Sequence, residues 1–386
     1  MTIEFIPSEE RTLLRDSVRR TLETGSLTWA QCAEMGWLMA GVPETAGGFG
    51  GNAYDLAIIA EEFGRATVTE PFIETAGVAI PALLALAPED TRIAAIAVGD
   101  LRVALAHDET GMGGDAKPLA AQAEPTGDGF VISARKVAVV GAPEADLLLV
   151  SAMIPSVGIS LFAVRPTPEM LKAHETIDGR TAATIILDRV IVTPDALIGT
   201  AGNAGGAVRL ALDHALILGS ADALGAMQAA LDLTRDYLLT RRQYGRSIGD
   251  FQALRHRLAD MFIETEQARS MVFRGLEALV EADEVTRTRL ASATKARVAK
   301  AGRFVTGEAI QLHGGIGVAE EYPLGRLFRR LLAFDLRHGA SAAHIDRFAR
   351  LRPQGIKRGP TSGTLESQFV HAREKLSVAG EASARS

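Results

Sequence analysis

The spacing of hydrophobic residues divides the chain into three blocks. Up to about residue 97, apolar residues recur at the three- and four-residue spacing of amphipathic helices, as in residues 8–23 (SEERTLLRDSVRRTLE) and 54–66 (YDLAIIAEEFGRA). Ser8 and the two glutamates that follow it are typical of a helix N-terminus, where a side-chain oxygen and negative charge stabilise unpaired amides. The first block, residues 1–97, is therefore predicted to be an N-terminal helical domain.

The second block, residues 98–200, has a different period. Short runs rich in Val, Ile and Leu are separated by Gly, Pro and Asp, which is typical of strands joined by turns. This pattern predicts a middle β domain. The clearest runs are LRVALA (101–106), GFVISARKVAVV (129–140), DLLLVSA (146–152), ISLFAV (159–164) and AATIILDRVIV (182–192).

Helical spacing returns in the third block, residues 201–352, in long segments such as residues 206–242. The tail at residues 353–386 is polar and low in large apolar residues, so we expect a loosely held extension. The order of the blocks predicts an α+β fold. A β domain between two helical domains leaves a crevice in which a flat ligand can bind.

Composition narrows the class of protein. The chain has 386 residues, 47% of them hydrophobic and 23% charged, and a formal net charge of −6, so nucleic acid is not an expected partner. The single cysteine, Cys32, excludes an intrachain disulfide framework and fits a reducing compartment. The eight histidines have no ligand spacing with cysteines, so we predict no metal site. We find no signal peptide and no apolar run of about 18 residues, and therefore expect a soluble cytoplasmic protein with no membrane span.

Four stretches together carry a resemblance to a known family. They are residues 35–51 (MGWLMAGVPETAGGFGG), 127–152 (GDGFVISARKVAVVGAPEADLLLVSA), 241–261 (RRQYGRSIGDFQALRHRLADM) and 311–323 (QLHGGIGVAEEYP). In this order they resemble segments of the acyl-CoA dehydrogenase family. The resemblance implies an N-terminal helical domain, a middle β-barrel or sandwich domain and a C-terminal four-helix bundle.

The resemblance also implies a chemistry and a cofactor. The family oxidises an acyl-CoA thioester: a glutamate removes the α-proton, and the β-hydrogen leaves as hydride to FAD. Proton removal needs a carboxylate whose pKa is raised by an apolar, water-poor site. The flavin carries out the redox step, and the protein supplies geometry and charge. The family also implies electron-transfer flavoprotein as the electron acceptor.

Part of the family's cofactor-binding pattern is present. In the family, an arginine motif and a Gln-x-x-Gly-Gly segment of one subunit contact the FAD of a neighbouring subunit. An arginine suits a pyrophosphate because its planar guanidinium donates paired charged hydrogen bonds, and glycines let backbone amides approach closely. Alternatively, the arginine pairs with a local acid and the two glycines only end a helix. The matching residues here are Arg241, Gln243, Tyr244, Gln311, Gly314 and Gly315.

The family's catalytic glutamate has no counterpart. Its commonest position corresponds to His338, and the position used by some other members corresponds to Ala215. The stretches that lie beside the flavin ring in the family correspond to residues 138–140 (AVV) and 106–108 (AHD), which lack the threonines that hydrogen-bond the ring. The residues that contact a chain's own flavin ring, and the catalytic base itself, are therefore largely missing from the pattern.

Two residues are candidates for a replacement base, and one for substrate contact. His338 qualifies because imidazole titrates near neutral pH. Asp222 follows Ala215 by seven residues, two turns along the same helix face. The alternatives are that His338 only bonds a backbone carbonyl and that Asp222 pairs with a helix neighbour. Asp213 matches a family aspartate that contacts the acyl-CoA, but it can equally pair with a nearby basic residue.

This pattern of retention and loss favours a heteromeric enzyme, such as a heterotetramer, in which a related subunit carries the flavin ring and the base. The chain also resembles small or partner subunits of heteromeric acyl-CoA dehydrogenases, some of which act in lipid or steroid side-chain catabolism. Two alternatives stay open. The chain could form a self-sufficient homomer with a replaced base, or it could be a structural subunit without catalytic residues.

Overall fold

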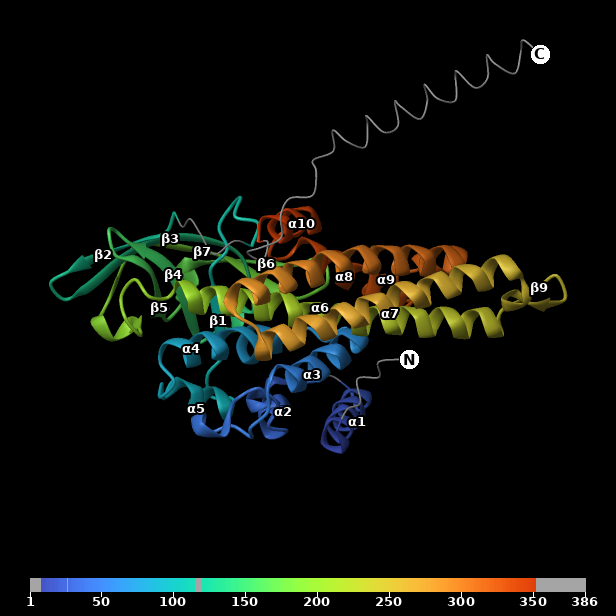
Figure 1. Cartoon of the computed structure of the whole chain (residues 1–386), viewed down its shortest axis with the longest axis horizontal. Helices are drawn as coiled ribbons and strands as arrows, with labels where there is room; N and C mark the ends of the chain where they lie inside the picture. The colour runs from blue at the N-terminus through green and yellow to red at the C-terminus, as the bar shows by residue number, and fades with distance from the viewer. Residues whose placement is uncertain (1–7, 26, 115–119, 352–386) are drawn as a thin grey trace, which may run out of the picture. The chain divides into compact units, whose positions relative to one another are not determined.

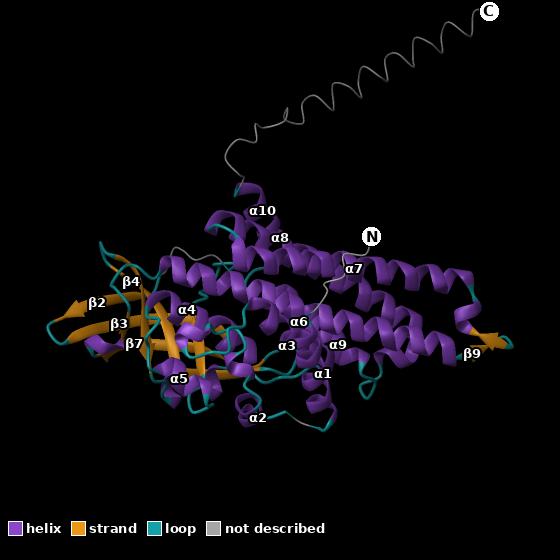
Figure 2. Cartoon of the chain, turned by 60° about the horizontal axis from the view of Figure 1, so that its bottom comes forward, coloured by secondary structure: helices purple, strands orange, loops and turns teal. Residues whose placement is uncertain are grey.

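Helices form both ends of the chain and strands form its middle, in the order that the hydrophobic pattern predicts. The computed structural model describes residues 8–25, 27–114 and 120–351, so the predicted tail at 353–386 lies outside the described residues. Figure 1 follows this order along the chain, and Figure 2 shows the strands of the main sheet gathered beside the helices. The fold class is therefore α+β, as predicted. The chain packs as one compact unit up to Leu351.

The N-terminal helices begin where capping side chains satisfy their first amides. Ser8 accepts a hydrogen bond from the Arg11 amide, and Asn52 and Asp55 form a capping box at the start of the third helix. The elements are α1 (Glu9–Glu23), α2 (Trp29–Glu34), η1 (Trp37–Met39), η2 (Glu44–Ala46), α3 (Ala53–Ala66), the π-helix η3 (Ile73–Ala79), α4 (Ile80–Leu86) and α5 (Arg92–Ala97).

The middle of the chain forms an eight-stranded sheet of order β6-β7-β3-β2-β4-β5-β8, with β1 paired in parallel to β4. The sheet encloses its own apolar core, which includes Leu148, Val150, Phe162 and Ile185. The strands are β1 (Val103–Ala106), β2 (Gln122–Thr126), β3 (Gly129–Val140), β4 (Leu147–Ile154), β5 (Gly158–Val164), β6 (Leu171–Glu175), β7 (Thr181–Val192) and β8 (Leu197–Ile198). Short 3-10 turns join them at η4 (Ala142–Glu144), η5 (Pro168–Met170) and η6 (Pro194–Ala196).

An irregularity in β3 matters for the site. The register between β3 and β7 shifts between Lys136 and Val139, so β3 has one extra residue there, and Val137 and Ala138 together oppose a single residue of β7. One of them, Ala138, has a φ of 52°, which is unusual for a residue other than glycine. Bulges re-aim side chains, and here the bulged segment borders both cavities described below.

The C-terminal part of the described chain is a bundle of long helices. Figure 1 shows β9 at the end of this bundle that lies away from the main sheet, and Figure 2 agrees. The elements are α6 (Gly205–Thr240), β9 (Arg242–Gln243), β10 (Arg246–Ser247), η7 (Ile248–Asp250), α7 (Gln252–Glu281), α8 (Glu284–His313), η8 (Gly314–Val318), α9 (Leu324–Leu336) and α10 (Ser341–Arg350).

The central helix of the bundle, α6, differs from the expectation that no segment resembles a membrane span. Within the described residues it is the helix that is long and apolar enough to cross a membrane by length and composition. However, 83% of its most apolar window is buried inside the protein, as in the core helix of a soluble protein. Its apolar character is explained by contacts with the surrounding helices, because it packs against α3, α7, α8 and α9.

Helices α3 and α6 approach each other closely at two glycines. A Cβ atom on Gly64 would lie 1.8 Å from the Asp222 carbonyl oxygen, and one on Gly225 would lie 1.8 Å from the Glu61 carbonyl oxygen. No side chain larger than hydrogen fits at either position without moving a helix. This contact fixes the first helical domain against the bundle and places η3 beside α6.

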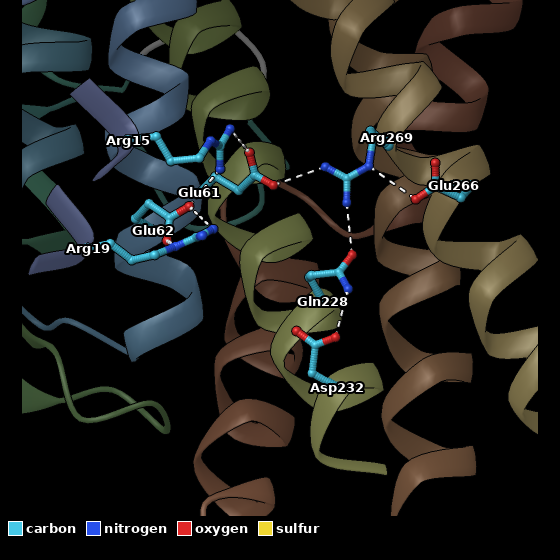
Figure 3. Close-up of polar contacts among 8 residues, drawn as sticks. All are labelled: Arg15, Arg19, Glu61, Glu62, Gln228, Asp232, Glu266 and Arg269. Carbon is cyan, nitrogen blue, oxygen red and sulfur yellow. Dashed lines mark hydrogen bonds and ion pairs between the residues drawn. The ribbon is translucent and has the colours of Figure 1, made fainter. Parts of the chain in front are cut away.

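An ion-pair network ties α1, α3 and α7 together (Figure 3). The Glu62 carboxylate is 2% exposed and accepts hydrogen bonds from Arg15 at 2.6 Å and from Arg19 at 2.9 Å. Glu61 links Arg15 on α1 to Arg269 on α7, at 2.8 and 3.0 Å. The network continues through Glu266, Gln228 and Asp232. It crosses between helices far apart in sequence, and therefore contributes to the same domain contact as the two glycines.

Candidate functional site

A narrow cavity of about 50 Å³, here called the inner cavity, lies where the sheet meets the helices. Its wall combines η3, the loop after β1, the β3 bulge, α6, α8 and the end of α9. Apolar side chains share this wall with many charged ones. The lining residues are Ile73, Glu74, Val78, Leu105, His107, Asp108, Val137, Ala138, Val139, Val140, Arg180, Leu212, Ala215, Leu216, Gly219, Asp222, Lys295, Phe334, Arg337 and His338.

A larger cavity of about 420 Å³, the outer cleft, adjoins it. Five residues border both spaces, so the two meet at a common wall. Glu109, Gly113, Gly114, Thr176, Ile177, Ala333, Leu336 and Gly339 line only the outer cleft. The shared residues are Asp108, Val137, Ala138, Arg337 and His338.

His338 and Asp108 form a pair in this common wall. His338 Nδ1 lies 2.8 Å from Asp108 Oδ2, and the side chains are 24% and 22% exposed. Burial raises the pKa of Asp108, but the charge and hydrogen bond of His338 outweigh it and lower the pKa to about 2. His338 also has a φ of 53°, a strained backbone of the kind that gathers at functional sites. The structure thus places the predicted residue His338 at the cavity, with a carboxylate that orients its ring.

The local packing explains why His338 holds this strained conformation. His344 Nε2 lies 2.9 Å from the His338 carbonyl oxygen, on the side facing α10. From the other side, the loop at Gly114 approaches so closely that a Cβ there would lie 1.8 Å from the same carbonyl oxygen. The backbone at His338 is therefore clamped between α10 and this loop.

Asp222 faces the inner cavity together with Ala215, as the seven-residue spacing predicts. However, both of its carboxylate oxygens accept hydrogen bonds from Arg330, at 2.8 and 2.5 Å. The partner lies on α9 and not on the same helix. Both oxygens of the carboxylate are therefore already engaged by a buried guanidinium. This geometry argues against Asp222 as the catalytic base.

Arg330 joins Asp222 to a second pair on the sheet side. Its Nη1 lies 3.5 Å from Asp178 Oδ2, and Asp178 pairs with Arg180 at 2.5 Å. Arg330, Asp178 and Asp222 side chains are 5% exposed or less. Burial lowers the pKa of Arg180 to about 10, helped by the neighbouring cations Arg330 and Arg337.

Two further charges border the inner cavity. Glu74 on η3 pairs with Arg337 at 2.7 Å. Lys295 on α8 is 1% exposed, and its ammonium donates to the Phe334 carbonyl and lies 3.7 Å from the centroid of the Phe334 ring. Sequence analysis missed all of these residues except Asp222, because no local spacing indicates that they converge.

Asp213, the candidate for substrate contact, does not line either cavity. Its side chain is fully buried and accepts hydrogen bonds from Thr288 at 2.8 Å and Arg287 at 3.0 Å, and Arg209 lies 3.9 Å away. Burial raises the pKa of Asp213 despite these partners. The contacts support the alternative that Asp213 pairs with nearby basic residues and joins α6 to α8.

The six predicted cofactor contacts line neither cavity. They lie in two segments, at the end of α6 with the β9–β10 hairpin and at the end of α8 with η8, and Figure 1 shows β9 at the end of the bundle away from the main sheet. All six residues are exposed, and Tyr244 is 91% exposed. Stacking of Tyr237 on His313, with ring centroids 4.5 Å apart, joins the two segments that carry them. This stack links the segment with Arg241, Gln243 and Tyr244, which runs from the end of α6 into the β9–β10 hairpin, to the segment with Gln311, Gly314 and Gly315, which runs from α8 into η8.

The chemistry of these two exposed segments fits a phosphate-bearing group. Arg241 lies at the end of α6, where its amide bonds the Tyr237 carbonyl at 2.9 Å. Gly314 has a φ of 63°, and no atom lies within 4 Å of the position of a Cβ on Gly314 or Gly315. The Gly314 amide itself donates to the Gln311 and Ile310 carbonyls. The exposed guanidinium and the uncrowded glycines remain suitable for a pyrophosphate presented by another molecule.

The outer cleft fits a bound flavin poorly. Its volume is suitable for a flat ring, but the donors at its wall are already engaged, Arg337 by Glu74 and His338 Nδ1 by Asp108. The Asp108 carboxylate also faces the cleft, and its Oδ1 is buried and makes no hydrogen bond in the described part of the chain. A flavin that accepts an electron pair gains negative charge and needs hydrogen-bond donors beside it. Thr176 cannot donate freely, because its hydroxyl already lies 2.5 Å from Asp178. We therefore derive no catalytic step through a flavin in this chain's own cleft.

Comparison with known proteins identifies relatives over most of the chain. Family models described as acyl-CoA dehydrogenase, C-terminal domain, and acyl-CoA dehydrogenase, N-terminal domain, match residues 203–351 and 14–93. Acyl-CoA dehydrogenase FadE12 of Mycobacterium tuberculosis is 28% identical over 349 residues, covering 82% of this chain and 89% of the relative. The caffeyl-CoA reductase–Etf complex subunit CarC of Acetobacterium woodii is 26% identical over 352 residues, covering 88% and 92%.

Solved structures show the same fold. The Tcur3481–Tcur3483 steroid ACAD G363A variant is 31% identical with a TM-score of 0.78, and the match covers 89% of this chain and 97% of that chain. The glutaryl-coenzyme A dehydrogenase in complex with glutaryl-CoA is 22% identical with a TM-score of 0.84, covering 93% and 99%. At that identity the second likeness concerns the fold alone.

Proposed function

Because the chain belongs to the acyl-CoA dehydrogenase family, whose members are FAD-dependent flavoproteins, we propose that it acts as one subunit of a heteromeric acyl-CoA dehydrogenase. The reaction is the α,β-dehydrogenation of an acyl-CoA thioester, in which bound FAD accepts the hydride. A related partner subunit carries the flavin ring and the catalytic base. This chain contributes the exposed segments that contain Arg241 and Gln311 to the FAD of that partner.

The observation that carries the proposal is that the acidic side chains around the inner cavity already have partners. Each carboxylate that lines it already has a partner: Asp222 pairs with Arg330, Glu74 pairs with Arg337, and Asp108 Oδ2 lies 2.8 Å from His338 Nδ1. The alternative family position of the base is Ala215, which cannot accept a proton. No glutamate stands at either family position of the base, and of the carboxylates that line this cavity only Asp108 has a buried oxygen, Oδ1, without a hydrogen bond in the described part of the chain.

Two relatives support the idea of partners and of an electron acceptor. The relative of known structure with 31% identity is described as a Tcur3481–Tcur3483 steroid ACAD, a name with two components. CarC belongs to a caffeyl-CoA reductase–Etf complex. By this analogy, the proposed assembly is a heterotetramer that acts on bulky acyl groups, such as steroid side chains, and passes electrons to an electron-transfer flavoprotein. The buried free thiol of Cys32 suits a reducing compartment, and we propose the cytoplasm.

A self-sufficient homomer is the second candidate, and one observation favours it. The His338 ring is oriented by Asp108 as a general base is oriented by a carboxylate, and it borders the inner cavity. In that case His338 would remove the α-proton, and the chain would hold its own flavin. The homomer therefore predicts that His338→Asn abolishes turnover by the chain alone.

The experiment that separates the two measures flavin per chain. The full-length chain is expressed alone and together with a related dehydrogenase chain encoded beside it, and bound FAD is quantified from its absorbance. We expect little FAD on the lone chain and one FAD for each pair of unlike chains in the complex. Stoichiometric FAD on the lone chain, with turnover that His338→Asn removes, would establish the homomer and refute the heteromer.

A further inference from the structure

Most of the charged side chains around the inner cavity form ion pairs. Three ion pairs border it directly or through one further side chain. They are Glu74–Arg337, Asp222–Arg330 and Asp178–Arg180, with closest distances of 2.7, 2.5 and 2.5 Å. In the described part of the chain, Lys295 forms no ion pair with a carboxylate; its ammonium instead meets the Phe334 carbonyl and ring. The nearby Asp335 is held by Arg303 at 2.8 Å.

Lys295 is therefore a buried cation of this wall that has no carboxylate bonded to it within the described residues. The Asp108 carboxylate in the same wall shares its Oδ2 with His338 and is 22% exposed. Lys295, by contrast, is 1% exposed. A buried charge without a counter-ion is costly, so the cavity favours an anion.

An unsatisfied donor points the same way. Arg180 lines the cavity and is 5% exposed, and its Nε makes no hydrogen bond in the described part of the chain. Its Nη2 is already used by Asp178. Buried polar groups almost always have a hydrogen-bond partner, so an orphaned guanidinium nitrogen in a cavity wall indicates an acceptor that enters the cavity.

We propose that the inner cavity binds a small carboxylate anion, whose oxygens accept hydrogen bonds from Arg180 and Lys295. A volume of about 50 Å³ restricts the ligand to a few heavy atoms, as in formate or acetate. A carboxylate is favoured over a spherical halide because a planar group matches the donor geometry of a guanidinium. This site stands on the cavity of this chain alone and does not depend on the proposed function.

Binding is coupled to the charge state of Lys295. Burial lowers the pKa of Lys295 to about 7; Asp335 raises it, and Arg337 and Arg180 lower it further. His344 on α10 is also electrostatically coupled to Lys295, and Asp222 on α6 and Glu74 on η3 face the same cavity. The anion binds the ammonium form better than the amine, so affinity falls as pH rises above about 7.

The test is the thermal unfolding of the full-length chain while sodium acetate replaces sodium chloride at constant total salt. We expect a saturating rise in Tm with acetate, and no rise with acetamide, which has the same shape but no charge. The dissociation constant for acetate should be at least about tenfold larger at pH 8.5 than at pH 6, because most Lys295 side chains lose their proton over that range. An equal effect of acetamide, or no difference between acetate and chloride, would overturn the site.

Two variants make the test specific to this cavity. Lys295→Met removes the ammonium while keeping a long side chain, and should abolish the response to acetate. Lys300→Met, on the exposed face of the same helix, is the matched control and should leave it unchanged. Arg180→Lys keeps the charge but removes Nε, and should weaken acetate binding without removing its pH dependence. A full acetate response in Lys295→Met, or in Arg180→Lys, would contradict the proposal.

Discussion

Replacement of Arg330 by methionine tests whether the ion pairs around the inner cavity stabilise the fold. Arg330 is 3% exposed and donates to both oxygens of Asp222 at 2.8 and 2.5 Å. It also lies 3.5 Å from Asp178. Arg330→Met fills a similar volume with an apolar chain but leaves the Asp222 carboxylate buried without a counter-ion.

The expected cost follows from that uncompensated charge. Removing one partner of a buried ion pair typically destabilises a protein by about 3–5 kcal/mol, whereas replacing both partners by apolar residues is often neutral. Asp178 retains Arg180 as its partner in the variant. We therefore expect Arg330→Met alone to lower the free energy of unfolding by about 3–5 kcal/mol. The double variant with Asp222→Leu should recover at least about 2 kcal/mol of this loss, the coupling expected between contacting residues.

The assay is urea unfolding at pH 7 of the two single variants and the double variant, followed by circular dichroism. Arg326→Met, on an exposed position of the same helix, is the control and should change stability by less than about 0.5 kcal/mol. The reasoning is refuted if Arg330→Met behaves like Arg326→Met. It is equally refuted if the double variant loses the sum of the two single effects.

Three other perturbations test separate parts of the fold. Gly225→Ala should destabilise the chain by about 1–3 kcal/mol in urea unfolding, because the new Cβ would lie 1.8 Å from the opposing backbone. Gly307→Ala is the control: no atom lies within 4 Å of its Cβ position, so it should stabilise the chain by about 0.5–1 kcal/mol. Burial lowers the pKa of His344 from 6.5 to about 3, so the native state holds it neutral and stability should fall by about 1.4 kcal/mol per unit as pH drops below 6.5. His344→Leu should flatten this slope in urea titrations at pH 7, 6 and 5, and an unchanged slope would exclude His344 as its cause. Glu62→Gln should weaken the contact between α1 and α3 and speed tryptic cleavage within α1, a change that would not occur if the network of Figure 3 were unimportant.

The spacing of hydrophobic residues predicted the main helices and strands, because an element that is buried on one or both faces has apolar residues at regular intervals. The missed strands lack this spacing. Residues 171–175 form β6 at the edge of the sheet and are largely exposed, so nothing selects apolar residues there. Strand β2 at residues 122–126 contains Pro125 and is mostly exposed after Ala123. Such strands are specified by their neighbours and not by their own composition.

The candidate site could be predicted only in part from the sequence, for a similar reason. Helical spacing correctly placed Asp222 beside Ala215 in the inner cavity. Its partner Arg330 is 108 residues away in the sequence, and no local pattern indicates such a pairing. A role for an exposed side chain such as Arg241 could be predicted only through family resemblance, because no contact of its side chain within residues 8–25, 27–114 and 120–351 explains it.

The central claim is that this chain holds the FAD of another subunit. Its most direct test is the rate and equilibrium of FAD loss from the purified heteromeric complex when Arg241→Ala is introduced in this chain only. A lost charged hydrogen bond is worth about 1.5–3 kcal/mol, so we predict FAD binding weaker by about tenfold to a hundredfold, with secondary structure unchanged. Arg235→Ala, an exposed arginine on the preceding helix, is the control and should have no effect. FAD retention in Arg241→Ala equal to that in Arg235→Ala would contradict the account.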